Sequence, residues 1–501
     1  MPFRQRLIKL YRQAFPPDGL SLSNLLGSGS IAAGICSRSK QVLFENFCWE
    51  LSMIKRPLNR SLALGIGIGM LVAGALSTGA SAQLAPSNAP AHGAPTYWSP
   101  ESNMQKPANV GVRTHTNVIG VLLPHANVRP SKPLASGGLT PQTAPLSGNY
   151  YETPSSLACV YGFITQTTGC NPANATGVIT SSGGQAIAIV DAYHNPDVAS
   201  DLASFASQFG LPAPSNFQVV YATGVQPPAD TSGWSLESSL DVEWAYAMSP
   251  NAKVIYLVEA ASSTISDLLV AVDKATSLVA AQGGGVVSMS WGSSEFSGQQ
   301  SYDSHFNSGS VAYVASAGDA PGVLWPSSSG YVISVGGTSL SRNPANGNFE
   351  AEMTWQQAGA GISAYVTRPS YQSGLSSIVG NYRGVPDIAA VADPNTGVWV
   401  CSQYACTSIY YCGGTYWVPV GGTSVAVPVE AGIISNKNVK YNAVHGALTA
   451  IYNHSIGSTR DITSGNCGPY AGYVTATGWD LCTGWGSLLG SVKVTTALNT
   501  P

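Results

Sequence analysis

The sequence predicts an α/β domain in which a mostly parallel β-sheet carries helices on both faces. One observation is a series of short apolar runs of the kind that form buried parallel strands, at residues 186–190, 254–257, 286–290, 311–315 and 332–335. The other is that stretches with helical spacing of apolar residues lie between several of these runs, at residues 198–209, 235–248 and 264–281. Strands that alternate with helices predict a single α/β domain, which we place at residues 150–501.

The N-terminal region contains a predicted signal peptide at residues 53–82. It has a basic start, an apolar stretch at 62–76 and a small-residue cleavage site at 80–82. Residues 1–52 are then interpreted as an upstream extension from a start codon assigned too early. A membrane anchor is the alternative, but the apolar stretch is short for a span and ends in a cleavage signal. We therefore expect no stable membrane insertion after the signal is removed.

Residues 83–149 are rich in Pro, Ala, Asn, Ser and Thr and show no sustained periodicity. We interpret most of this range as a linker or extended arm. One apolar, strand-like run interrupts it at residues 118–123.

Charged residues make up 9% of the chain, against about 25% in average proteins. Polar surface must therefore come largely from Ser, Thr, Asn, Gln and Tyr, whose hydration does not depend on ionisation. This suits a secreted protein working in acid, and it also suits any extracellular protein rich in Gly, Ser and Thr. Beyond residue 82 the chain has 13 basic and 22 acidic residues, a formal net charge of −9. Such a chain lacks the basic patch expected of a nucleic-acid-binding protein.

Seven cysteines follow the signal peptide, and in an exported protein most of them should form disulfides. Local spacing favours Cys159 with Cys170 and Cys467 with Cys482. The remaining three lie at residues 401–412, and one of them must stay free or pair elsewhere. No pair has the Cys-x-x-Cys spacing of a zinc site or redox centre.

Ser424, in the sequence GGTSVAVP at residues 421–428, is the candidate nucleophile. A serine nucleophile needs a base within hydrogen-bond reach and a group that orients the base. Histidine is the usual base, but three of the seven histidines lie in the 83–149 segment and the other four are isolated and without a motif. The chain offers carboxylates instead.

Glu237 and Asp241 are the carboxylates that could replace a histidine. They are four residues apart in the predicted helix 235–248 and therefore lie on one helix face. Like charges at this spacing destabilise a helix. Because two adjacent carboxylates cannot both ionise cheaply, they would share a proton and titrate as a unit. On spacing alone, a solvated helix face is an equally good interpretation.

Asp319 is a third candidate acid, in a turn at residues 316–319 that directly follows a predicted strand. Asp191 and the segment 290–292 also follow such strands, and sites in parallel sheets usually form there. Taken alone, an aspartate in this position is more often a turn or cap residue. When protonated, however, Asp319 could donate a hydrogen bond to the oxyanion that forms when Ser424 attacks a carbonyl.

Together and in this order, these motifs resemble the sedolisin family of serine-carboxyl peptidases. The matching segments are AIVDAY at 188–193, ESSLD at 237–241, SWG at 290–292, SAGD at 316–319, RGVPD at 383–387 and GTSVAVP at 422–428. The resemblance covers residues 153–490 and implies a subtilisin-like fold with a Ser-Glu-Asp triad. It implies Ser424 as nucleophile, Glu237 as general base and then acid, Asp241 as the partner of Glu237, and Asp319 as oxyanion stabiliser.

The resemblance also implies a calcium site near the C-terminus, built from an Asp-Ile dipeptide and a later loop of carbonyl and carboxylate ligands. The matching residues are Asp461, Ile462, Ala476, Gly478 and Asp480. Ala476 stands where the family has glycine, a change that a backbone carbonyl ligand tolerates if the local φ is negative. The alternative is a turn stapled by a disulfide between Cys467 and Cys482.

These features predict a secreted, extracellular, monomeric endopeptidase that binds Ca²⁺ and cleaves proteins or peptides in acid through an acyl-enzyme. An extended substrate should pair with backbone near residues 290–292. One alternative is a subtilisin-type protease with a histidine base, active near neutral pH. Another is an inactive relative that binds protein or sugar. Asp191, Glu243 and Asp387 are interpreted as structural, and the 83–149 segment is too short for the large prodomain that family members commonly have.

Overall fold

The computed structural model describes residues 96–122, 151–165, 169–180, 183–409, 416–468 and 473–490. The chain divides into residues 1–80 and 81–501, and all described residues belong to the second unit. The predicted upstream extension and signal peptide lie outside the described residues, as does the end of the predicted arm from residue 123. No helix within the described ranges is long and apolar enough to cross a membrane.

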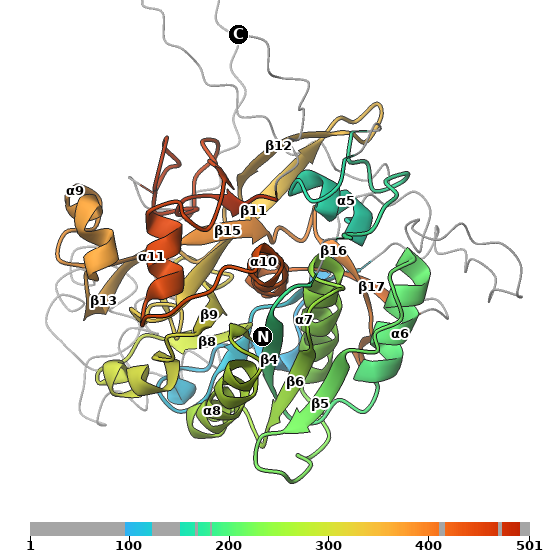
Figure 1. The fold of residues 1–501 in the computed structure, drawn as a ribbon, viewed down its shortest axis with the longest axis horizontal. Coiled ribbons are helices and arrows are strands. Elements are labelled where there is room, and N and C mark those ends of the chain that lie inside the picture. Colours follow the sequence, from blue (N-terminus) through green and yellow to red (C-terminus); the bar gives the residue numbers. More distant parts are fainter. Residues whose placement is uncertain are drawn as a thin grey trace, which may run out of the picture. The chain divides into compact units, whose positions relative to one another are not determined.

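A central sheet of eight strands organises the domain (Figure 1). Its strands are β4 (Ala186–Ala192), β5 (Phe217–Tyr221), β6 (Ile255–Ala260), β7 (Gly285–Met289), β9 (Val311–Ser316), β11 (Ile333–Arg342), β12 (Phe349–Thr354) and β15 (Ile388–Val391). They run in the order β12-β11-β9-β7-β4-β6-β5, and β15 also pairs with β11. Every pairing is parallel except that of β11 with β12. The predicted mostly parallel sheet is therefore confirmed.

Helices cover both faces of this sheet, as predicted. The longer helices are α6 (Val198–Phe209), α7 (Trp234–Met248), α8 (Ile265–Ala281) and α10 (Thr423–Lys437). Helix α8 packs on one face, in a core that includes Ala188 and Val190 of β4. Helices α7 and α10 pack against each other on the opposite face, in a core that includes Ile187 and Ile189. Successive side chains of β4 thus feed two separate cores, as the alternation of a strand requires.

Helix α7 is buried along its whole length. It begins after Gly233, whose φ of 113° is in the left-handed region, and Asp230 caps it by accepting hydrogen bonds from the backbone N–H groups of Gly233 and Ser235 at 3.0 and 2.8 Å. A helix buried on every side places any acidic residue away from water, where ionisation is costly. This location sets the chemistry of Glu237 and Asp241.

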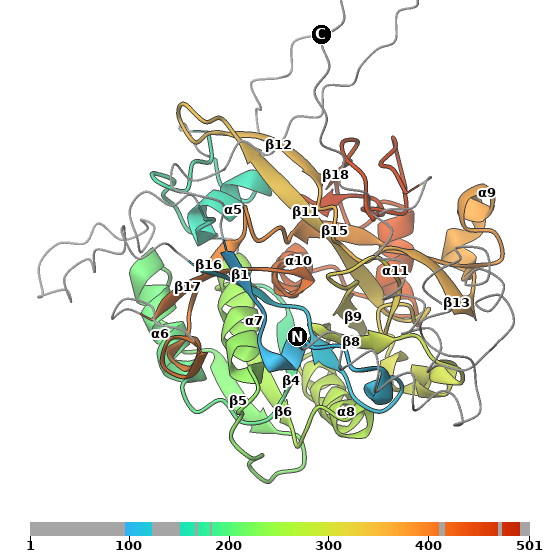
Figure 2. The same ribbon diagram turned by 180° about the vertical axis from the view of Figure 1, so that it is seen from behind.

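Three strands of the predicted arm pack against the domain (Figure 2, blue). They are β1 (Thr96–Trp98), β2 (His115–Thr116) and β3 (Ile119–Leu122). Strand β2 pairs with β8 (Trp291–Ser294), and β3 pairs with both β1 and β17 (Trp417–Gly421). The described part of the arm is therefore extended chain added to the edges of small sheets.

The remaining elements are short. The strands are β10 (Leu324–Trp325), β13 (Gly361–Thr367), β14 (Tyr382–Val385), β16 (Val398–Cys401), β18 (Thr459–Arg460) and β19 (Ser487–Leu488). The helices are α5 (Pro154–Val160), α9 (Ser376–Val379) and α11 (Gly446–Tyr452), the 3-10 helices η2 (Glu101–Asn103), η3 (Pro107–Asn109), η5 (Gln299–Phe306) and η6 (Ser370–Leu375), and the π-helical turn η7 (Ala405–Ile409).

The predicted disulfides Cys159–Cys170 and Cys467–Cys482 are both present. In the 401–412 group, Cys401 is the free cysteine and is buried, and Cys406 is disulfide-bonded. Cys412 lies outside the described residues.

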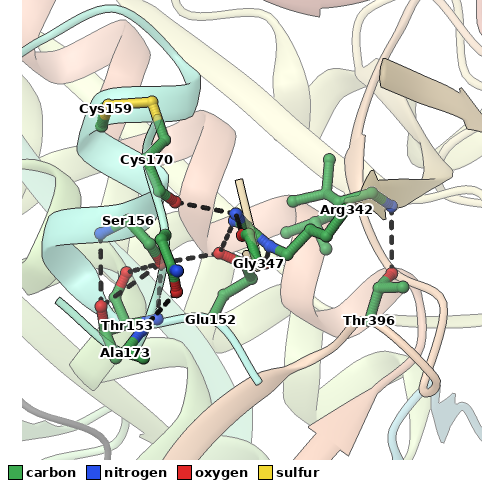
Figure 3. A network of polar contacts seen from close by, with 12 residues as sticks. Glu152, Thr153, Ser156, Cys159, Cys170, Ala173, Arg342, Gly347 and Thr396 are labelled. Carbon is green, nitrogen blue, oxygen red and sulfur yellow. Dashed lines mark hydrogen bonds and ion pairs between the residues drawn. A yellow bond between two sulfur atoms is a disulfide. The ribbon is translucent and has the colours of Figure 1, made fainter. Parts of the chain in front are cut away.

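A buried ion pair fixes the start of the peptidase-like region to the sheet (Figure 3). Arg342, at the end of β11, donates from Nε and Nη2 to the two carboxylate oxygens of Glu152 at 2.7 and 2.6 Å. Its Nη1 donates to the carbonyls of Cys170 and Gly347. Because the guanidinium is bidentate and fully partnered, its desolvation is compensated by strong hydrogen bonds.

Candidate active site

Ser424 is the second residue of α10 and is fully buried. The helix follows β17 through Gly421 and Gly422, and Gly422 has a φ of 101° that a residue with a Cβ rarely adopts. The Ser424 hydroxyl donates to the carbonyl of Ser290 at 3.2 Å and accepts a hydrogen bond from the backbone N–H of Asn117 at 3.1 Å. The arm residue Asn117 is thus in direct contact with the candidate nucleophile.

Ser290 connects the nucleophile to the acid pair. It directly follows β7, and its hydroxyl donates to Asp241 Oδ1 at 2.9 Å. The same Oγ lies 3.5 Å from the carbonyl oxygen of Ser424. Pro428 stands four residues after Ser424 and has no N–H, so this carbonyl lacks its usual helical donor. The proline in the GTSVAVP motif therefore leaves an acceptor that faces Ser290.

Glu237 and Asp241 lie on the part of α7 that faces this serine, and both are fully buried. Burial raises the pKa of Glu237 well above its ordinary value, and the charges of Asp241 and Asp191 raise it further. The Ser424 hydroxyl partly offsets this rise. Neither Glu237 oxygen accepts a hydrogen bond of good geometry from a described residue, because the Ser424 hydroxyl is turned toward Ser290. The pKa of Asp241 is also raised, by burial and then by Asp191, against a hydrogen bond from Ser290.

Asp191, interpreted from the sequence as structural, belongs to the same group of acids. It lies in β4, is buried, and neither of its carboxylate oxygens has a hydrogen-bond partner among the described residues. Burial and the charge of Glu259 raise the pKa of Asp191. Glu259 in turn accepts a hydrogen bond from His194 Nδ1 at 2.8 Å. Several carboxyl groups thus compete for few ionised states, which favours protons shared among them.

Asp319 follows β9 and meets the start of α10. Its Oδ1 accepts hydrogen bonds from the Thr423 backbone N–H and hydroxyl at 2.7 and 2.9 Å. Its Oδ2 has no partner within the described part of the chain. Burial raises the pKa of Asp319 to about 7, although the bonds from Thr423 oppose the rise. Below that pH Asp319 is a neutral acid with a proton available to donate, as the oxyanion role requires.

Histidine is not placed to serve as a base among the described residues. The hydrogen-bond partners of Ser424 are Asn117 and Ser290, and none of the described histidines bonds to Ser424, Glu237 or Asp241. His115 comes nearest in sequence to the site-contacting residue Asn117, and burial lowers its pKa. The geometry favours the carboxylate pair.

Two other predicted structural residues have partners that explain their burial. Asp387 forms a buried ion pair with Arg383 at 2.7 Å and accepts a hydrogen bond from the Ser334 backbone N–H. Glu243 accepts a hydrogen bond from the Cys401 backbone N–H at 3.0 Å. Both carboxylates hold neighbouring elements in place.

The segments predicted to bind calcium lie together. Gly478 N–H donates to Asp461 Oδ2 at 2.8 Å, which joins the two loops. Asp480 accepts hydrogen bonds from the backbone N–H groups of Ala476, Cys482 and Thr483, as in a closed turn. Within the described ranges, no group of three or more His, Cys, Asp or Glu is arranged to hold a metal ion. A carboxylate that accepts one N–H keeps other lone pairs for a hard cation, so the donor set, completed by backbone carbonyls, fits calcium without demonstrating it.

Sequence reasoning missed the contributions of Ser290 and Asn117. The SWG motif marked residues 290–292 as a place for substrate, and nothing in it indicated that the Ser290 hydroxyl bonds Asp241. The apolar run after Asn117 was the one available signal that the arm is ordered there.

Comparisons with known proteins agree with this geometry. The model of the Subtilase family matches residues 240–443. Kumamolisin of Bacillus sp. (strain MN-32) is 31% identical over 341 residues, which cover 61% of this chain and 59% of that protein. Sedolisin of Pseudomonas sp. (strain 101) is 36% identical over 187 residues, which cover 34% of this chain and 30% of that protein. The alignments thus span less than two thirds of the length of either relative.

One solved structure resembles the fold of this chain. Its title is Pseudomonas sedolisin (serine-carboxyl proteinase) complexed with two molecules of pseudo-iodotyrostatin. The TM-score is 0.54 at 24% identity, and the match covers 68% of this chain and 95% of the other. This likeness confirms the predicted subtilisin-like fold.

Proposed function

Because this chain belongs to the sedolisin family, we propose that it is a serine-carboxyl endopeptidase that hydrolyses peptide bonds of proteins through an acyl-enzyme on Ser424. The observation that carries the proposal is the buried connection from Ser424 through Ser290 to Asp241, beside Glu237, in a site where the described histidines take no part. The relatives named above are peptidases by name, which agrees with this chemistry.

The proposed reaction begins when the Ser424 hydroxyl turns from Ser290 to Glu237. Glu237 accepts the hydroxyl proton while Oγ bonds the substrate carbonyl carbon, and it then donates that proton to the leaving amine. Asp241 shares the negative charge of the pair, so the pair works while it holds one proton. Asp319, when protonated, and the backbone N–H of Ser424 stabilise the oxyanion.

This scheme requires acid. The activity should rise with pH as the Glu237/Asp241 pair releases its first proton. It should fall as the pair releases its second proton, and also as Asp319 ionises near pH 7 and loses the proton it would donate. A histidine base would instead require neutral pH.

The test is cleavage of a denatured protein between pH 2 and pH 8 by protein expressed from Met53. Ser424→Ala and Glu237→Gln should each lower kcat by at least about a hundredfold, the lower range for loss of a positioned general base. Glu243→Gln is the matched control, because it removes another buried carboxylate of α7 that lies outside the proposed machinery. Activity near neutral pH that survives Glu237→Gln would refute the carboxylate mechanism.

We further propose that the protein is secreted as a monomer and binds Ca²⁺ at the segments around Asp461 and Asp480. Support for secretion comes from the signal-like sequence and from the disulfides. Support for calcium comes from the adjacent loops and their oxygen donors. If calcium binds there, millimolar Ca²⁺ should raise the melting temperature of the intact protein, and Asp461→Asn should reduce that rise. An unchanged melting temperature with Ca²⁺ or with a chelator would exclude the site.

A further inference from the structure

The arm crosses the candidate active site as an extended chain. Strand β2 pairs antiparallel with β8, with His115 opposite Gly292 and Thr116 opposite Trp291. Strand β3 pairs antiparallel with β17, with Ile119 opposite Gly421. The two residues between these pairings are Asn117 and Val118, which are 1% and 0% exposed. The chain is therefore held by strand addition on both sides of Ser424.

The backbone of Asn117 brackets the nucleophile. Its carbonyl oxygen accepts a hydrogen bond from Ser424 N–H at 3.1 Å, and its own N–H donates to Ser424 Oγ at 3.1 Å. A Cβ placed on Gly422 would collide with this carbonyl oxygen and with Asp319 Oδ2. The Asn117 carbonyl thus lies beside the two groups, Ser424 N–H and Asp319, that would stabilise an oxyanion.

The neighbouring atoms hold this peptide in register. The Asn117 side-chain amide donates to Ser316 Oγ at 2.8 Å, and Ser316 is fully buried at the end of β9. The Val118 carbonyl accepts a hydrogen bond from Asn103 Nδ2 at 2.8 Å. Both sides of the Asn117–Val118 bond are therefore fixed by specific contacts.

We propose that Asn117–Val118 is a peptide bond that this protein cleaves in its own chain, and that Ser316 recognises the side chain of the residue before that bond. The proposal rests on the peptidase function proposed above and identifies its first substrate. Glu237 takes the Ser424 proton as Oγ bonds the Asn117 carbonyl carbon. The C–N bond to Val118 then breaks, with the Glu237 proton passing to the Val118 nitrogen. Water hydrolyses the ester, which leaves a carboxylate on Asn117, a free Ser424 and a new N-terminus at Val118.

The chain contains its own control for local sequence. The dipeptide Asn-Val occurs at 109–110, 117–118 and 127–128 within the arm. Asn109 ends the 3-10 helix η3, and Val110 is 39% exposed. If a preference for Asn-Val alone selected the bond, the accessible 109–110 bond would be cut as well. Geometry at Ser424 predicts cleavage at 117–118 only.

The experiment follows the intact mass and the N-terminal residues of protein expressed from Met53 after transfer to acid. We expect a new terminus at Val118, formed at a first-order rate that does not change with protein concentration. Ser424→Ala should abolish it. Ser316→Ala and Asn117→Ala should each slow it by roughly 10-fold, the cost of losing a buried hydrogen bond. Asn109→Ala is the matched control and should leave the rate unchanged.

Cleavage of an added denatured protein, measured in the same samples, separates the two proposals. Cleavage of the added protein without a terminus at Val118 overturns this inference and leaves the proposed function intact. So does a Val118 terminus that persists in Ser424→Ala. Equal rates in wild type and Ser316→Ala would remove Ser316 from the proposal. Loss of both cleavage reactions in a protein that melts cooperatively would refute both proposals.

Discussion

Ionisation of Asp319 should make the stability of this protein depend on pH, and Asp319→Asn should remove that dependence. The side chain is buried, with a pKa of about 7 in the folded protein against an ordinary value of 3.8. The folded state therefore binds this proton more tightly than the unfolded chain does. The stabilisation is fully present below pH 3.8 and is lost as the pH rises from about 4 to about 7.

The magnitude follows from the difference between the two pKa values. A difference of about 3, at about 1.4 kcal/mol for each, gives a loss of about 4 kcal/mol across that range. Asparagine has the same shape and is neutral at every pH in the range. Its carbonyl oxygen can still accept the hydrogen bonds from Thr423, so the variant should fold.

The assay is urea unfolding at intervals from pH 4 to pH 8, with both proteins carrying Ser424→Ala to prevent proteolysis. The other buried acids are common to both proteins, so their contributions cancel in the difference between the two unfolding free energies. We expect that difference to shift by about 4 kcal/mol in favour of Asp319→Asn as the pH rises. A difference that stays constant from pH 4 to pH 8 would refute the assignment of a raised pKa to Asp319.

Two further predictions concern stability. Glu152→Ala leaves the buried Arg342 guanidinium without its partner and should lower the unfolding free energy by about 3–5 kcal/mol. The matched control is Glu101→Ala, whose exposed pair with Lys106 should contribute less than about 1 kcal/mol, and similar losses in both variants would contradict the argument. Removing the Cys467–Cys482 disulfide with a double serine variant opens a loop of 15 residues and should cost about 3 kcal/mol, measured by the same unfolding assay. An unchanged midpoint would show that the surrounding turn holds without the disulfide.

The sequence contained enough information to predict the sheet and its helices because their apolar patterns are local. Helix α6 spans the residues predicted for it, and β9 differs from its prediction by one residue. The adjacency of Glu237 and Asp241 follows from the helical repeat alone. The large rise in their pKa values does not, since it depends on α7 being buried on every side by α10 and the sheet.

The contact between Asn117 and Ser424 could not be predicted in the same way. The two residues are 307 positions apart, and no periodicity links them. Proline, alanine and asparagine around the arm are typical of a linker, and they conceal a segment that pairs with two separate strands. The strand-like run at 118–123 shows only that some chain there can be extended. Which sheet edge it joins depends on where β8 and β17 leave unpaired backbone groups, which is a property of the folded domain.

Cleavage at Asn117–Val118 would not by itself clear the active site. Strand β1 pairs with β3, with Thr96 opposite Leu122, so the chain before the cut remains bound to the chain after it. Cutting the bond changes an intramolecular contact into one between two fragments, whose association falls on dilution. We therefore expect a lag between the appearance of the Val118 terminus and cleavage of added protein, and the lag should shorten at lower protein concentration. Simultaneous appearance of both at every concentration would show that the arm leaves as soon as it is cut.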